Sequence, residues 1–146
     1  MVQRFPWMMM AVMVFALVAV GCSKKPEDAL LKHMEKMEKI MDSNMEKPKK
    51  GVEELRSYMQ SNLPEMLEIV GKAMVELDKI DDKGKREERA KEMMKALEKG
   101  SESFATTAQK FGMKVMTDPD AGKYLEEWGE SWSGLSGLMD MLGALR

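Results

Sequence analysis

The chain has 146 residues, enough for one domain, of which 33% are charged and 44% are hydrophobic. This balance is typical of a globular or helical protein and excludes a largely disordered chain. The 23 basic and 25 acidic residues nearly cancel, and the net charge of -2 argues against nucleic acid as a partner. Only 6% of the residues are aromatic, whereas methionine occurs 18 times.

The first 21 residues have the pattern of an export signal. A short start that carries Arg4 precedes the almost wholly apolar stretch 5–20. A membrane-spanning helix needs about 20 apolar residues, so this stretch is too short to span a bilayer comfortably. A basic start, a short apolar stretch and small residues at its end are the features of a secretory signal peptide. We therefore predict a signal peptide over residues 1–21, and its removal leaves 22 basic against 25 acidic residues, a net charge of -3.

The end of this signal, Ala19-Val20-Gly21-Cys22, resembles the lipobox of bacterial lipoproteins. In that family a small residue precedes a cysteine that is acylated before the signal peptidase cuts. Gly21 and Cys22 match the motif, whereas Ala19 stands where leucine is more usual. Cys22 is also the only cysteine, and acylation would consume a thiol that is otherwise left reactive in an oxidising compartment. The alternatives are an ordinary signal peptide and an uncleaved anchor.

The resemblance implies a location. Cys22 would carry a diacylglyceryl group and an amide-linked acyl chain of the palmitate type, and this lipid would be the membrane partner of the protein. Ser23 follows the cysteine where a signal for retention in the inner membrane would usually place aspartate. This favours the outer membrane, with the protein facing the periplasm. Residues 22–26 are then a short lipidated tether, and residues 27–146 form the domain.

The domain begins with an amphipathic helix. Glu27 and Asp28 follow Pro26, and acidic residues favour a helix N-terminus. Apolar residues then recur every three or four positions, which places them on one helical face: Leu30, Met34, Met37, Met41 and Met45. Residues 47–51 interrupt this helix, because proline cannot continue it and glycine favours a turn.

A second periodic stretch follows, interrupted by Pro64 without a change of phase. We predict a kink there, or a helix that ends near Asn62 and restarts at Pro64. Residues 81–84 are expected to form a turn. The apolar positions of the second helix are Val52, Leu55, Met59, Leu63, Met66, Val70, Met74 or Ala73, Leu77 and Ile80.

A third helix is expected from Lys85 to about Met116, with Gly100 and Gly112 as local weak points. Asp118 and Pro119 then predict the start of a last helix, since aspartate caps free backbone donors and proline suits the first helical position. No stretch alternates as a strand would. The predicted fold is all-α, an antiparallel up-down four-helix bundle, with a three-helix bundle as the alternative.

His33, Met37 and Met41 are the candidates for a metal site. One imidazole with several thioethers suits copper(I), and haem could take the same histidine as a ligand. The competing interpretation is that the methionines belong to the core, because methionine recurs at core positions far from any histidine, including Met59 and Met93. We expect no cofactor, with an exported metal- or haem-binding bundle as the alternative. We also expect His33 to lie at a partly exposed position on the helix flank.

Catalysis has little support in the sequence. The only histidine would have to serve any histidine-based mechanism, and the only cysteine is the lipidation candidate. Glu126, Glu127 and Glu130 cluster in the last helix, where exposed carboxylates commonly favour the helix dipole. There is no phosphate-binding glycine loop and no zinc motif. We predict that the protein is not an enzyme.

The last helix differs from the others because Asp140 is its only charged residue between Ser131 and Leu145. One broad side is apolar: Trp128, Trp132, Leu135, Leu138, Met139, Leu142 and Leu145. We expect this side to pack into the bundle. The opposite side is small: Gly129, Ser133, Ser136, Gly137 and Ala144. A smooth side of small residues allows another backbone to approach closely, so it is the candidate contact surface for an envelope protein or a second copy. The alternatives are a helix buried on two sides and a fraying tail.

Overall fold

The computed structural model describes residues 25–143, with the side chain of Leu142 left out. Within that range the structure is all-α, as predicted, and contains no strand. It has five α-helices and one short 3-10 helix: α2 (Pro26–Ser43), α3 (Pro48–Asp78), α4 (Lys83–Gly100), α5 (Glu102–Thr117), η1 (Ala121–Lys123) and α6 (Leu125–Gly143).

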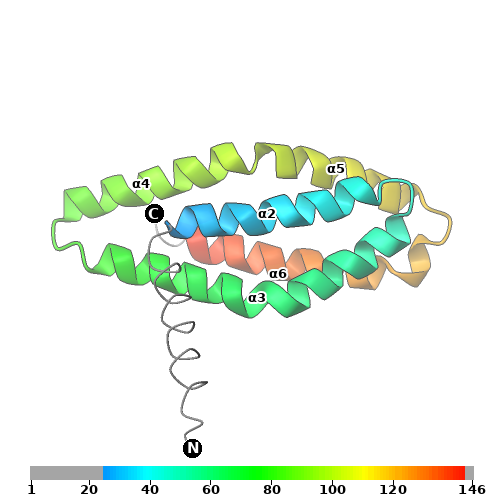
Figure 1. Cartoon of the computed structure of the whole chain (residues 1–146), viewed down its shortest axis with the longest axis horizontal. Helices are drawn as coiled ribbons and strands as arrows, with labels where there is room; N and C mark the ends of the chain where they lie inside the picture. The colour runs from blue at the N-terminus through cyan, green and yellow to red at the C-terminus, as the bar shows by residue number, and fades with distance from the viewer. Residues whose placement is uncertain (1–24, 144–146) are drawn as a thin grey trace, which may run out of the picture.

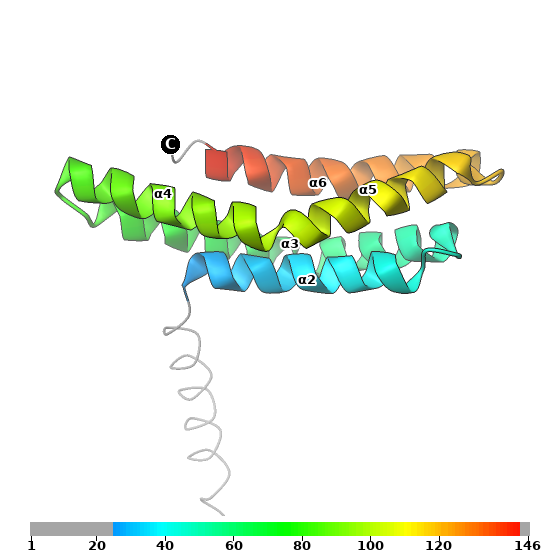
Figure 2. The same ribbon diagram turned by 90° about the horizontal axis from the view of Figure 1, so that it is seen from above.

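The helices lie side by side along one long axis (Figure 1). Successive helices reverse direction, except that α5 continues the direction of α4 (Figure 1). Helix α2 packs mainly on α3 and α5, and α6 packs mainly on α3. The C-terminal end of α6 lies at the same end of the bundle as the start of α2 (Figures 1 and 2).

Prolines begin both of the first two helices. Pro26 and Pro48 occupy the first turn of α2 and α3, where a missing N–H is tolerated because it would have no partner inside the helix. The predicted break at residues 47–51 was therefore misplaced: the link is residues 44–47, and residues 48–51 already belong to α3. Asn44 closes it, since its side-chain amide donates to the carbonyl oxygen of Ile40 at 2.7 Å and to Glu54 Oε2 at 2.9 Å.

Helix α3 runs through Pro64 without a break. The predicted restart at Pro64 is therefore wrong. Proline has no backbone N–H, so the carbonyl oxygen of Gln60 loses its usual partner in the helix. Both residues are exposed, so water can hydrogen-bond to that oxygen instead. At the position where the sequence left two choices, Ala73 is buried and Met74 is 40% exposed.

The predicted third helix is divided in two at Gly100 and Ser101. Helix α2 packs closely against this point. A Cβ atom added at Gly100 would lie 2.5 Å from Leu31 Cδ2, so the end of the leucine side chain would have to shift. Glycine also weakens a helix by about 1 kcal/mol relative to alanine, which makes this the natural place for the break. The weak point was predicted, but the interruption was not.

Asp118 and Pro119 do not begin the last α-helix. Asp118 Oδ1 accepts from the backbone N–H of Asp120 at 3.0 Å and closes a turn, which η1 follows. The hydroxyl of the buried Tyr124 donates to the other carboxylate oxygen of Asp118. This hydrogen bond lowers the pKa of Asp118, while burial raises the pKa of the Tyr124 hydroxyl. The tyrosine thus fixes the link, and α6 starts only at Leu125.

Two apolar cores hold the helices together. The larger one joins α2, α3, α5 and α6 and includes the fully buried Met37, Met41 and Phe111. The smaller one joins the end of α3 to α4 through Ala73, Leu77, Ala90 and Met93. The residues of both cores lie between Leu30 and Leu138.

Candidate functional site

The predicted lipidation site, Cys22, lies outside the residues that the structure describes, as do the signal peptide and most of the tether. The described chain starts at Lys25, one residue before α2. Within residues 25–143, none of the helices combines the length and the apolar composition needed to cross a membrane.

His33 lies between α2 and α3 and is only 6% exposed. Its Nδ1 is 2.6 Å from the Tyr58 hydroxyl oxygen, and its Nε2 is 3.7 Å from Glu65 Oε2. Burial lowers the pKa of the imidazole despite the nearby carboxylate. The expectation of a partly exposed position on the helix flank was wrong, because Tyr58 and Glu65 of α3 enclose the ring. Both ring nitrogens face protein partners.

Met37 and Met41 are buried in the larger core, 1% and 0% exposed. Their thioethers pack among apolar side chains of neighbouring helices, so these two methionines are part of the core. Within residues 25–143 no group of three histidine, aspartate or glutamate side chains gathers closely enough to hold a metal ion. The polar groups that the structure places beside the His33 ring are the Tyr58 hydroxyl and the Glu65 carboxylate.

A partly buried ion-pair cluster ties the start of α2 to α3 and α4. Arg89 Nη1 lies 2.8 Å from Glu27 Oε1, and Arg89 Nε lies 2.8 Å from Glu76 Oε1. Burial of Glu27 works to raise its pKa, but the hydrogen bonds from Arg89 hold the pKa below its usual value. The arginine in turn remains protonated. Sequence reasoning missed this cluster, because residues 27 and 89 are brought together only by the packing of helices.

The carboxylates at the start of α6 serve a structural role. Arg56 of α3 pairs with Glu127 at 3.3 Å and with Glu130 at 3.2 Å. These contacts hold α6 on α3 and leave Glu126 exposed. The glutamate cluster therefore does not converge on a cavity.

The four small residues of the candidate contact surface, Gly129, Ser133, Ser136 and Gly137, are all exposed. An added Cβ at Gly129 or Gly137 would meet no atom within 4 Å. We call these four residues the outer face of α6. Ala144 and Leu145 lie outside the described residues.

The apolar side of α6 packs into the bundle only in part. Leu135 and Leu138 are buried and Trp128 is half-buried, but Trp132 is 40% exposed and Met139 is 37% exposed. The expectation of full burial was therefore wrong for Trp132 and Met139. The reason is that α6 packs on α3, whereas its side toward α5 stays open.

An apolar groove runs between α5 and α6, with a volume of about 560 Å³. Three aromatic rings from the two helices line it: Trp128 stacks on Trp132 at 5.5 Å between ring centroids, and Trp132 stacks on Phe104 of α5 at 6.3 Å. Ala105, Ala108 and Gly112 line the α5 side. Sequence reasoning missed this groove, although the row of small residues at helical spacing on α5 was a usable signal.

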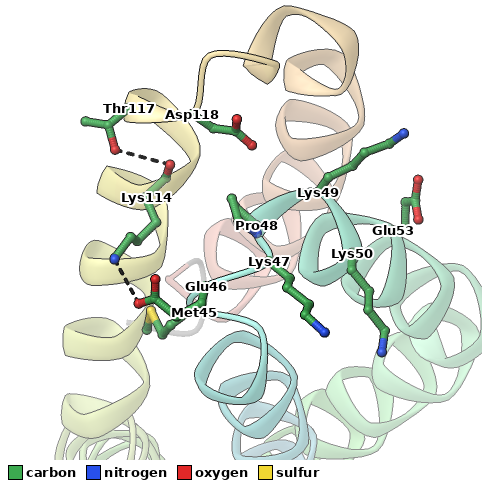
Figure 3. Close-up of a pocket in the computed structure, with 10 residues that line it drawn as sticks. All are labelled: Met45, Glu46, Lys47, Pro48, Lys49, Lys50, Glu53, Lys114, Thr117 and Asp118. Atoms are coloured by element: carbon green, nitrogen blue, oxygen red, sulfur yellow. Dashed lines mark hydrogen bonds and ion pairs between the residues drawn. The ribbon is translucent and has the colours of Figure 1, made fainter.

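A second hollow, of about 510 Å³, lies where the α2–α3 link meets the end of α5 (Figure 3). Four lysines line it, but Glu46, Glu53 and Asp118 stand beside them. Lys114 pairs with Glu46 at 2.9 Å. The side chain of Lys49 points away from those of Lys47 and Lys50 (Figure 3). Lysines and carboxylates thus share this lining, so it does not form an anion site.

Comparisons of this chain with protein-family models, with curated proteins and with solved structures give no match.

Proposed function

We propose that this chain is a non-catalytic lipoprotein of the cell envelope, anchored by acylated Cys22 and exposed to the periplasm. Its domain acts as a four-helix bundle in which α4 and α5 form one interrupted helix. The bundle is a structural or interaction module that contacts another envelope protein, or a second copy, through α6.

The observation that carries the interaction role is the composition of the α6 surface. Its outer face is formed by Gly129, Ser133, Ser136 and Gly137, and the exposed Trp132 lies beside it. A helix face that meets only solvent normally carries lysine and glutamate, as α4 does here. An exposed surface that combines small residues with large apolar ones is characteristic of contact with another protein.

No observation favours the alternative of a copper- or haem-binding bundle. Both nitrogens of His33 face Tyr58 and Glu65, and Met37 and Met41 are packed in the core. Metal binding would require the α2–α3 contact to open. The same geometry argues against His33 as a general base, because its Nδ1 is already bonded to a tyrosine hydroxyl.

The substitution Cys22→Ser tests the anchor. We expect the variant to incorporate no labelled fatty acid and to leave the membrane fraction, because the thiol is the only group that this lipid chemistry can use. The readouts are acyl labelling in cells, membrane fractionation and the mass of the purified protein. Ser23→Ala is the matched control and should behave as the wild type. Unchanged fractionation and unchanged mass of Cys22→Ser would overturn the proposal.

A further inference from the structure

The groove between α5 and α6 is open because the two backbones stay apart and only side chains bridge them. Phe111 meets Trp128 at 5.5 Å between ring centroids, and Phe104 meets Trp132 at 6.3 Å. Trp132 nevertheless leaves 40% of its surface exposed, and Met139 leaves 37%. This is a contiguous apolar surface on a bundle whose other sides are largely charged.

The lining selects the chemistry of an occupant. None of the twelve residues that line the groove is charged, and the polar ones are only Ser101, Gln109 and Ser136. Its volume of about 560 Å³ falls within the range of about 300–1,000 Å³ typical of small-molecule sites. The occupant that fits is narrow, flexible and uncharged, which describes a long acyl chain.

The position of the groove shows which acyl chain is within reach. Met34 of α2 and Ser101, which lies between α4 and α5, line it. Leu31 of α2 packs against Gly100, directly before Ser101. The start of α2 lies about 12 Å from Met34 along the helix axis, at 1.5 Å per residue. Residues 22–25 add about 13 Å of reach when extended. An acyl chain on Cys22 therefore reaches the groove from the end of the bundle where α2 begins.

We propose that the α5–α6 groove holds one acyl chain carried by Cys22 of the same molecule. This inference rests on the lipid anchor of the proposed function and adds a second place for the lipid besides the membrane. Membrane binding strengthens with every acyl methylene that enters the bilayer. A molecule with one chain in the groove and the other two in the bilayer is thus held less firmly than one with all three chains inserted.

The test uses the chain from Cys22 to Arg146. This chain contains both cores, has Cys22 as its only cysteine, and retains only Trp128 and Trp132 of the three tryptophans. Cys22 is alkylated with a maleimide that bears a hexadecyl chain, or with the same reagent brominated along the chain. Bromine quenches tryptophan emission on contact. We expect the brominated chain to cause a loss of emission that does not change on dilution, and the plain chain to shift the emission to shorter wavelength.

Two variants of α5 form a matched pair. Ala105→Glu places a charge in the groove, whereas Thr106→Glu places the same charge at the next exposed position, outside the lining. We expect Ala105→Glu to abolish the quenching and Thr106→Glu to preserve it, with the helix content of both unchanged by circular dichroism. Quenching that is absent in the wild-type chain, or that survives Ala105→Glu, would overturn the inference.

Two further outcomes separate the sources of failure. Quenching that disappears on dilution would mean that the chain enters the groove of a second molecule, and the assignment to the same molecule would be wrong. The quenching experiment uses chemical alkylation and so does not depend on acylation in cells. Absence of an acyl label on Cys22 in cells would therefore overturn the proposed anchor, and with it the natural occupant, whether or not the groove accepts the hexadecyl chain.

Discussion

At the residue scale, His33 should make the stability of the domain depend on pH. Burial lowers the pKa of the folded imidazole below the ordinary value of 6.5. The unfolded chain therefore binds a proton more readily than the folded one, and the contribution of the neutral ring is lost as the pH falls below about 6.5. We expect the free energy of unfolding to decrease between about pH 7.5 and about pH 5.5, measured by urea denaturation.

The variant His33→Gln isolates this contribution. We expect a flatter pH dependence over the same interval and a loss of about 1–3 kcal/mol at neutral pH, because a partly buried hydrogen bond to Tyr58 is disturbed. A position on the helix flank would have predicted a cost of less than about 1 kcal/mol. A pH dependence that His33→Gln leaves unaltered would show that other groups cause it.

A second prediction at this scale compares two aromatic residues. Phe111 is fully buried, whereas Trp132 is 40% exposed. We expect Phe111→Ala to lower the free energy of unfolding by about 3–5 kcal/mol, and Trp132→Ala to lower it by about 1–2 kcal/mol. Chemical denaturation of both variants measures the difference. Equal costs would mean that the α5–α6 groove is closed in solution.

At the element scale, the helices were largely predictable and their junctions were not. The three- and four-residue spacing of Leu30, Met34, Met37 and Met41 marks a buried face, and all four residues are buried. The division after Gly100 was missed because a glycine inside a helical pattern marks a weak point without showing whether the helix ends there. The start of α6 was misplaced because the Asp118–Tyr124 hydrogen bond depends on the buried position of Tyr124. The spacing of apolar residues predicts which side of a helix is buried. The residues at which a helix begins or ends depend on contacts between helices, which the spacing does not contain.

Two glycines of α3 should respond in opposite ways to the same substitution. A Cβ at Gly51 would lie 2.5 Å from Phe111 Cζ and 2.8 Å from Asn44 Cβ, so the helices could not approach as they do. Around Gly71 no atom lies within 4 Å of an added Cβ. We expect Gly71→Ala to stabilise the domain by about 0.5–1 kcal/mol, since alanine is the better helix former. Gly51→Ala should destabilise it by about 1–3 kcal/mol through overpacking.

Thermal unfolding of the two variants, checked by urea denaturation, measures these effects. Each serves as the control for the other, because both replace glycine by alanine in one helix. A stabilising Gly51→Ala would mean that α2, α3 and α5 are not packed as closely as their Gly51–Phe111 contact requires.

At the scale of the whole molecule, the sequence predicted which residues of α6 are outward but not what lies beside them. Gly129, Ser133, Ser136 and Gly137 are exposed, and their small size was visible in the sequence. The groove next to them depends on the separation of α5 from α6, which no local pattern encodes. The enclosure of His33 likewise depends on Tyr58 and Glu65, residues 25 and 32 positions along the chain.

The contact role of the outer face of α6 leads to the last prediction. Ser133→Arg places a long charged side chain in the middle of that face, and an exposed position tolerates such a change at little cost in stability, about 0.5 kcal/mol or less. Any surface that packs against the small residues would meet the bulky cation, so association should be lost while the fold is kept.

Ser61→Arg introduces the same side chain at an exposed position of α3 and is the matched control. Chemical cross-linking of intact envelopes should give an adduct with the wild type and with Ser61→Arg, and no adduct with Ser133→Arg. An adduct that persists in Ser133→Arg would remove this face from the interaction. If Ser133→Arg instead unfolds the domain as severely as Phe111→Ala, the outer face is part of the core.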